Sequence, residues 1–270
     1  MAEIGPSCPR RSANGRPGYG TKPPPSGMLI IMCHSTDSRP PAPPVRGEVA
    51  AHEQTELTAA DGNRFLAYRA EPAEPNGRSM VILPDIRGLH PYYRDLAVRF
   101  AEAGFRTIAI DYFGRTAGLG DRGDDFPFRP HVDQLTSDHV RADALAATQA
   151  LDGPVFTVGF CLGGAQSLRQ AAEGNGLAGG IGFYPTLRFV EPPESGPGAP
   201  LLMLLGGADR ATPREQSAAY EAALDRAGTP YEKHVYPGAP HAYFDRSYTK
   251  WTEVCQDSWR RILDFVERHS

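Results

Sequence analysis

The feature that most constrains this chain is a glycine-rich turn at residues 159–164, with the sequence Gly-Phe-Cys-Leu-Gly-Gly. An apolar run at residues 154–158 predicts a buried strand before it, and an alanine-rich segment predicts a helix after it. Such a turn is so sharp that a Cβ at the flanking glycines would clash. Glycine-rich turns also serve packing or phosphate binding, but here the centre is a thiol. We expect Cys161 to stand exposed above a sheet, where the helix dipole favours a thiolate.

Two further residues follow predicted strands in an order that supports this interpretation. The apolar strand at residues 201–205 leads into Asp209, and the strand at residues 232–236 leads into His241. Nucleophile, acid and histidine thus occur in the chain order of the α/β-hydrolase triad. We therefore expect Cys161, Asp209 and His241 to form one hydrogen-bonded group.

Polar residues near these strand ends also have structural alternatives. Asp209 could cap the helix that follows it, although Thr212, with Pro213 and Glu215, already predicts a capping box there. His234 is a rival to His241, but it lies inside a strand pattern, on the surface or in the core. Asp111, just after another strand, is expected to anchor a loop.

Length and composition limit the remaining possibilities. The chain has 270 residues, 40% apolar content and a net charge of −4, and its pI is about 6.1. We therefore expect neither nucleic acid nor a membrane as a partner, since no apolar run approaches the ~20 residues of a bilayer span. The four cysteines show no metal-ligand spacing, and a free catalytic thiol suggests the reducing cytoplasm. They are Cys8, Cys33, Cys161 and Cys255.

The order of the segments predicts a disordered tail and one α/β domain. Residues 1–50 are rich in Pro, Gly and Ser and lack the apolar surface to offset their ordering entropy, whereas residues 51–270 alternate strands with helices. We expect a mostly parallel sheet with helices on both faces. The predicted strands are 54–58, 64–68 (joined by an Asp-Gly turn), 79–84, 106–110, 154–158, 180–184, 201–205 and 232–236. The predicted helices are 92–103, 132–151, the segments after 161 and 212, and 248–268, with a long loop at 112–132.

Six motifs together resemble the dienelactone hydrolase (carboxymethylenebutenolidase) family of α/β-hydrolases, over residues 53–268. They lie at residues 83–89, 93–97, 109–113, 159–164, 205–209 and 236–243. The resemblance implies that Cys161 is the nucleophile and that Asp209 and His241 complete the triad, with no cofactor and no metal. It also implies that the oxyanion is bound by the backbone N–H groups of Ile86 and Leu162.

The chain departs from the family pattern in the residue before Ile86. The family usually has a glutamate there, which is thought to hold the thiol until substrate arrives, and this chain has Asp85. We expect Asp85 to modulate the Cys161 thiol. The alternative is a plain surface ion pair between Asp85 and Arg87.

The substrate-binding arginines of the family are only approximately matched. The nearest candidate after the catalytic histidine is Arg246, displaced by about one residue, while Arg122 and Arg129 compete in the long loop. Arg87 is a possible substitute, and Tyr243 is a candidate for the pocket wall. These arginines suggest an anionic small-molecule substrate, bound by a monomer or a homodimer.

The predicted activity is hydrolysis of a carboxylic ester or lactone through a thioester on Cys161. One alternative is another hydrolase on the same fold, cleaving thioesters or peptides. A second is a non-catalytic protein that uses Cys161 as a redox-sensing thiol. His131, Asp138 and His139 are too irregularly spaced for a metal site, and we expect them in solvated positions.

Overall fold

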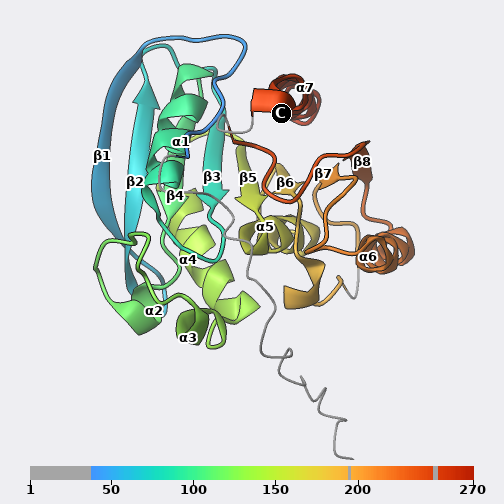
Figure 1. Cartoon of the computed structure of the whole chain (residues 1–270). Coiled ribbons are helices and arrows are strands. Elements are labelled where there is room, and N and C mark those ends of the chain that lie inside the picture. Colours follow the sequence, from blue (N-terminus) through green and yellow to red (C-terminus); the bar gives the residue numbers. More distant parts are fainter. Residues whose placement is uncertain (1–37, 194–195, 246–248) are drawn as a thin grey trace, which may run out of the picture. The chain divides into compact units, whose positions relative to one another are not determined.

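One eight-stranded sheet runs through the centre of the domain, as Figure 1 shows. Its strand order is β1-β2-β4-β3-β5-β6-β7-β8, and β2 is antiparallel to both of its neighbours while the pairs from β4 to β8 are parallel. The mostly parallel sheet predicted from the alternation is therefore confirmed. The strands are β1 (Val49–Thr58), β2 (Arg64–Pro72), β3 (Ser79–Leu83), β4 (Arg106–Ile110), β5 (Val155–Phe160), β6 (Gly179–Phe183), β7 (Leu201–Gly206) and β8 (Tyr231–Tyr236).

The computed structural model describes residues 38–193, 196–245 and 249–270, all within one compact unit that spans residues 33–270. The predicted tail up to residue 37 lies outside the described residues, and so does Arg246.

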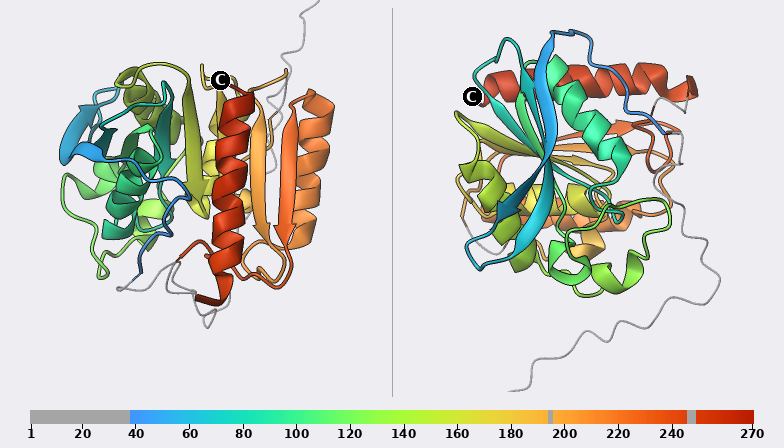
Figure 2. Two further views of the ribbon diagram at one scale, coloured as in Figure 1. Left: turned by 90° about the horizontal axis from the view of Figure 1, so that it is seen from above. Right: turned by 90° about the vertical axis from the view of Figure 1, so that its left-hand side faces the viewer.

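Helices cover both faces of the sheet (Figure 2). One apolar core lies under α1 and α7, and a second core on the opposite face lies under α4, α5 and α6. The helices are α1 (Pro91–Glu102), α2 (Gly114–Ala117), α3 (Arg129–Val132), α4 (Ser137–Gln149), α5 (Leu162–Ala172), α6 (Arg214–Ala227) and α7 (Thr252–Arg268), with 3-10 turns η1 (Leu187–Phe189) and η2 (Thr249–Trp251).

The strand register places five loops at one edge of the sheet. The last residues of neighbouring strands pair with one another, as Leu83 does with Gly159, Phe160 with Phe183, and Gly206 with Tyr236. Parallel strands that end level present their following loops side by side. The loops after β3, β5, β6, β7 and β8 therefore meet, and these loops contain the residues predicted for the site.

Three predicted boundaries differ from the structure. The loop predicted at residues 112–132 contains the short helices α2 and α3, because four-residue turns leave no periodic apolar pattern in the sequence. Helix α4 begins at Ser137 rather than near residue 132, since the Thr136 side chain accepts a hydrogen bond from the His139 N–H at 3.2 Å. Helix α6 has Pro213 at its N-cap and no side-chain cap, so the capping box predicted from Thr212 is wrong.

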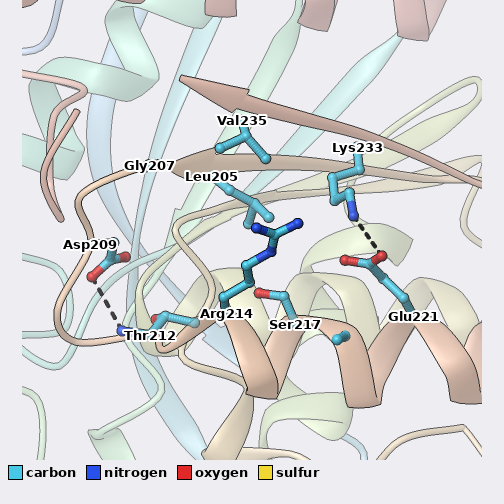
Figure 3. Close-up of a pocket in the computed structure, with 11 residues that line it drawn as sticks. Leu205, Gly207, Asp209, Thr212, Arg214, Ser217, Glu221, Lys233 and Val235 are labelled. Carbon is cyan, nitrogen blue, oxygen red and sulfur yellow. Dashed lines mark hydrogen bonds and ion pairs between the residues drawn. The ribbon is translucent and has the colours of Figure 1, made fainter. Parts of the chain in front are cut away.

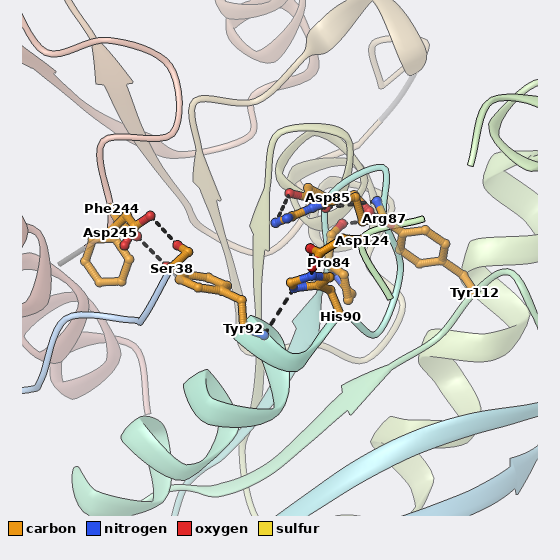
Figure 4. Close-up of polar contacts among 10 residues, drawn as sticks. All are labelled: Ser38, Pro84, Asp85, Arg87, His90, Tyr92, Tyr112, Asp124, Phe244 and Asp245. Carbon is orange, nitrogen blue, oxygen red and sulfur yellow. Dashed lines mark hydrogen bonds and ion pairs between the residues drawn. The ribbon is translucent and has the colours of Figure 1, made fainter. Parts of the chain in front are cut away.

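Residues 38–43 pack on the domain, although the sequence predicts disorder through residue 50. The Trp259 indole N–H donates to the Pro41 carbonyl at 3.1 Å, and the Ser38 hydroxyl donates to Asp245 (Figure 4). A buried indole N–H needs an acceptor, and this proline-rich segment supplies one. The packed domain therefore begins before residue 51.

Candidate active site

Cys161 lies at the turn between β5 and α5, with φ 55° and ψ −113°. An L residue rarely adopts such a backbone, and strain of this kind is concentrated at functional sites. The flanking glycines are required by close backbone approach: a Cβ at Gly159 would lie 1.9 Å from the Gly163 carbonyl oxygen, and one at Gly163 would lie 2.1 Å from that of Leu83. The sharp turn expected from the sequence is present.

The expected exposure of this thiol is not present, because Cys161 is only 6% exposed. Loops from neighbouring strands close around it. The Cys161 carbonyl accepts a hydrogen bond from the Thr186 N–H at 3.0 Å, which ties the turn to the loop after β6. The thiol is therefore at the base of a covered site rather than on an open surface.

His241 and Asp209 are joined by a short hydrogen bond. His241 Nδ1 lies 2.8 Å from Asp209 Oδ2, and both side chains are buried. The other carboxylate oxygen, Oδ1, accepts the N–H groups of Ala211 and Thr212 at 2.8 and 3.2 Å. The loop-binding and histidine-binding roles of Asp209 are thus both present, one on each oxygen.

The charge state of His241 follows from these contacts. Burial lowers the pKa of the imidazole, but the hydrogen bonds with Asp209 and Cys161 and the charge of both groups outweigh it and raise the pKa to about 10. An imidazolium is therefore favoured at neutral pH. A positive imidazole beside a thiol stabilises the thiolate, which is the reactive form of cysteine.

The sulfur itself contacts a threonine. Cys161 Sγ and Thr186 Oγ1 lie 3.3 Å apart, and either atom can be the donor. The hydrogen bonding and charge of Cys161 raise the pKa of His241, which indicates that the sulfur lies near the imidazole.

The candidate oxyanion donors come from neighbouring elements. Leu162 is the first residue of α5, where backbone N–H groups have no acceptor within the helix. Ile86 belongs to the turn that follows β3, the strand beside β5. The Tyr112 hydroxyl donates into this turn, within hydrogen-bond distance of the Pro84 carbonyl and 2.7 Å from that of Asp85. These hydrogen bonds from Tyr112 stabilise the turn that contains Ile86.

Asp85 and Arg87 form a buried pair (Figure 4). The carboxylate accepts the backbone N–H of Arg87 at 2.9 Å, and the guanidinium lies 3.2 Å from the other carboxylate oxygen. Asp85 is fully buried and Arg87 nearly so, which rules out the surface ion pair considered above. A buried pair of this kind holds both side chains in one arrangement, because breaking it leaves an uncompensated charge.

The other predicted substrate residues lie in different environments. Arg129 is exposed at the start of α3, whereas its competitor Arg122 is buried in an ion pair of 2.7 Å with Asp111, the loop anchor. Tyr243 is fully buried, and its hydroxyl lies 3.4 Å from Ser258 Oγ. Arg246 is outside the described residues.

Sequence reasoning did not identify Thr186 or Tyr112. Thr186 lies only three residues past β6, so its position after a strand end was the signal that could have identified it. Tyr112 likewise follows β4, but a tyrosine there is equally consistent with ordinary packing.

A separate hollow of about 470 Å³ lies between β7, β8 and α6 (Figure 3). Asp209 and Thr212 reach one end of it, and Lys233 pairs with Glu221 at 2.6 Å at the other end. Cys161 and His241 do not line it. This hollow backs the Asp209 loop and is distinct from the thiol site.

The described part of the chain shows neither a metal-binding cluster nor a membrane-spanning helix. Within residues 38–193, 196–245 and 249–270, no three His, Cys, Asp or Glu side chains are grouped so that they could hold a metal ion. No helix in the described part of the chain combines the length and the apolar character needed to cross a membrane.

Comparisons with known proteins identify similar chains. The sequence model of the dienelactone hydrolase family matches residues 65–270. A carboxymethylenebutenolidase from Rhodococcus opacus is 28% identical over 261 residues, which cover 88% of this chain and 97% of that protein. The crystal structure of a candidate dienelactone hydrolase from Klebsiella pneumoniae subsp. pneumoniae superposes with a TM-score of 0.62 at 27% identity, covering 79% of this chain and 98% of that one.

Proposed function

This chain belongs to the dienelactone hydrolase family, and from that premise we propose that it hydrolyses a carboxylic ester or lactone with Cys161 as nucleophile. His241 acts as the base and Asp209 orients it. The observation that carries the proposal is the 2.8 Å hydrogen bond from His241 to Asp209, next to a cysteine held in a strained turn. An orienting acid, a base and a nucleophile in this relation are what acyl transfer requires.

The reaction begins from the ion pair of the Cys161 thiolate and the His241 imidazolium, in which the thiol proton already lies on Nε2. The thiolate attacks the substrate carbonyl carbon, and the electron pair of the C=O bond moves to oxygen. The backbone N–H groups of Ile86 and Leu162 bind this oxyanion. Collapse of the intermediate breaks the bond to the leaving oxygen, which takes the proton from Nε2, and leaves a thioester on sulfur.

The second half of the reaction returns the Cys161 thiolate and the His241 imidazolium. Water gives a proton to Nε2 of His241 as its oxygen attacks the thioester carbonyl. Collapse of the second intermediate releases the carboxylic acid, and Cys161 leaves as a thiolate. Asp209 stabilises the imidazolium that forms in each half, and does not itself take the proton.

The substrate class follows from the leaving groups. Because thiolate leaves readily, the first intermediate reverts unless the departing oxygen is also a good leaving group. An enol lactone or another activated ester meets this condition better than a simple alkyl ester. A relative from Rhodococcus opacus is named carboxymethylenebutenolidase, in agreement with a lactone substrate.

Anionic substrates would be bound by the cationic residues predicted from the sequence. Arg87 lies beside the oxyanion loop, with its charge already balanced by Asp85. Arg129 and Arg246 are the further candidates, and Tyr243, two residues after His241, is the candidate for the pocket wall. We propose in addition that Asp85 influences the thiol, and that the protein acts in the cytoplasm as a monomer or homodimer.

Replacement of the nucleophile tests this proposal. Cys161→Ser should lower the kcat/KM for p-nitrophenyl acetate by at least about a thousandfold, since a serine hydroxyl does not supply the thiolate. The matched control is Cys255→Ser: Cys255 is also buried, and its sulfur donates to the Tyr243 carbonyl at 3.2 Å. Unchanged turnover in Cys161→Ser would exclude Cys161 as nucleophile.

Alkylation separates a hydrolase from a thiol without turnover. Burial raises the pKa of Cys255 to about 12, so iodoacetamide should modify Cys161 first and Cys255 slowly. Loss of ester and lactone hydrolysis in step with modification of Cys161 supports the proposal. A reactive Cys161 in a protein that turns over no ester, lactone or thioester would favour a redox-sensing role instead.

A further inference from the structure

The hydroxyl of Thr186 is placed to act on the reactive sulfur. Thr186 Oγ1 lies 3.3 Å from Cys161 Sγ, and Thr186 is only 1% exposed. The backbone fixes this contact from both sides, because the Thr186 N–H donates to the Cys161 carbonyl at 3.0 Å and the Thr186 carbonyl accepts from Phe189 at 3.1 Å. The hydroxyl is thus held against sulfur by bonds that do not involve its side chain.

A hydroxyl can serve both charge states of a thiol. Toward a neutral thiol it accepts the S–H, and toward a thiolate it rotates and donates its own proton. The second arrangement is the stronger one, because a hydrogen bond to an ionised group is about twice as strong as a neutral bond. At this site the imidazolium of His241 favours the thiolate, so the hydroxyl is expected to donate.

Arg87 binds the Asp85 carboxylate near this site. Both oxygens of Asp85 accept hydrogen bonds from Arg87, at 2.9 and 3.2 Å. A neutral hydroxyl has an advantage over a carboxylate as a partner for a thiolate, because it carries no like charge.

We propose that Thr186 is a positioning residue, whose hydroxyl stabilises the Cys161 thiolate before substrate binds and then releases it toward the carbonyl. The inference rests on the proposed function only where it concerns turnover. Its core statement concerns the thiolate and holds whether or not an ester is hydrolysed. No covalent bond is made or broken at Thr186.

The test compares Thr186→Val, which removes the hydroxyl at constant shape, with Thr186→Ser, which keeps it. The rate of Cys161 carboxamidomethylation by iodoacetamide is followed by mass spectrometry between pH 5 and 10. A hydrogen bond to an ionised group predicts that the midpoint of this profile rises by about one to two pH units in Thr186→Val, and that Thr186→Ser restores it. Thr157→Val is the matched control, since Thr157 is buried and its hydroxyl lies 2.8 Å from Ser167 Oγ.

A folded Thr186→Val protein with an unchanged midpoint would overturn the proposal. If that variant does not fold by circular dichroism, Thr186→Ala against Thr186→Ser gives the same comparison. Turnover of p-nitrophenyl acetate provides the second readout: its pH profile should move with the alkylation profile. Should Cys161→Ser retain turnover, the proposed function fails, while the alkylation result still decides the role of Thr186.

Discussion

The glycine at position 163 allows the most direct test of the site geometry. A Cβ there would lie 2.1 Å from the Leu83 carbonyl oxygen and 2.2 Å from that of Pro84, whereas ordinary contact begins at 3.4 Å. Gly163→Ala must therefore separate α5 from the end of β3 by about 1.3 Å. Both carbonyl oxygens are backbone atoms in the core, so neither can move away by a change of side-chain rotamer.

The displacement affects stability and chemistry together. Overpacking of a core costs about 1–3 kcal/mol, and backbone obstacles place this variant at the upper end, at about 3 kcal/mol. The two proposed oxyanion donors belong to the two segments that would be pushed apart. Leu162 directly precedes Gly163 in α5, and Ile86 lies two residues after Pro84 in the turn that follows β3. A misplacement of about 1 Å costs on the order of a hundredfold in rate.

Urea denaturation measures the first effect, and the kcat/KM for p-nitrophenyl acetate in the remaining folded protein measures the second. The control is Gly47→Ala, whose Cβ would have its nearest neighbour, the Glu102 carbonyl oxygen, at 3.5 Å. We expect this control to stay within about 1 kcal/mol of the wild type. If Gly163→Ala matched the control in both stability and rate, the turn would not hold the donors as argued.

Three further predictions concern charge and backbone conformation. Asp209→Asn should lower the rate of ester hydrolysis about 10³–10⁴-fold. Because the pKa of His241 is raised from 6.5 to about 10, the wild type should have a larger free energy of unfolding than this variant, by the full amount below pH 6.5 and by less as the pH rises through 10. Urea titrations in which this difference grows with pH would contradict the prediction. Burial raises the pKa of Asp143 from 3.8 to about 6, so the stabilising contribution of the protonated carboxyl is present below pH 3.8 and lost as the pH rises through 6. Relative to Asp143→Asn, the free energy of unfolding of the wild type should fall by up to about 3 kcal/mol between pH 4 and 7. Parallel curves of stability against pH for the two proteins would refute this prediction. Gly228→Ala should cost about 1 kcal/mol at the end of α6, where φ is +69°, and a urea midpoint at or above that of the wild type would count against it.

Most elements of this fold could be predicted because their signals are local. The apolar runs of β3 and β7 and the spacing of α1 and α7 specify their own conformations. The short helices α2 and α3 could not be predicted, since four residues carry no period. The N-cap of α6 was misassigned, because Pro213 occupies that position and the preceding loop is held by the Asp209 carboxylate, which binds the N–H groups of Ala211 and Thr212.

The site could be predicted in part for the same reason. Cys161 and its glycines are dictated by the sterics of a tight turn, a property of six consecutive residues, and the order of Asp209 and His241 follows from strands that can be recognised one by one. The proposed nucleophile and its two proposed partners could therefore be identified as candidates from the sequence.

The arrangement around that group depends on which strands become neighbours. Strands β3, β5 and β6 lie side by side and end level. This alignment buries the Asp85–Arg87 pair and Cys161, and it brings the sulfur of Cys161 into contact with Thr186. Register between separate strands is decided by packing of the whole sheet, and no local pattern encodes it. Short-range sterics thus select the reactive groups, while long-range packing decides how far they are exposed and what they touch.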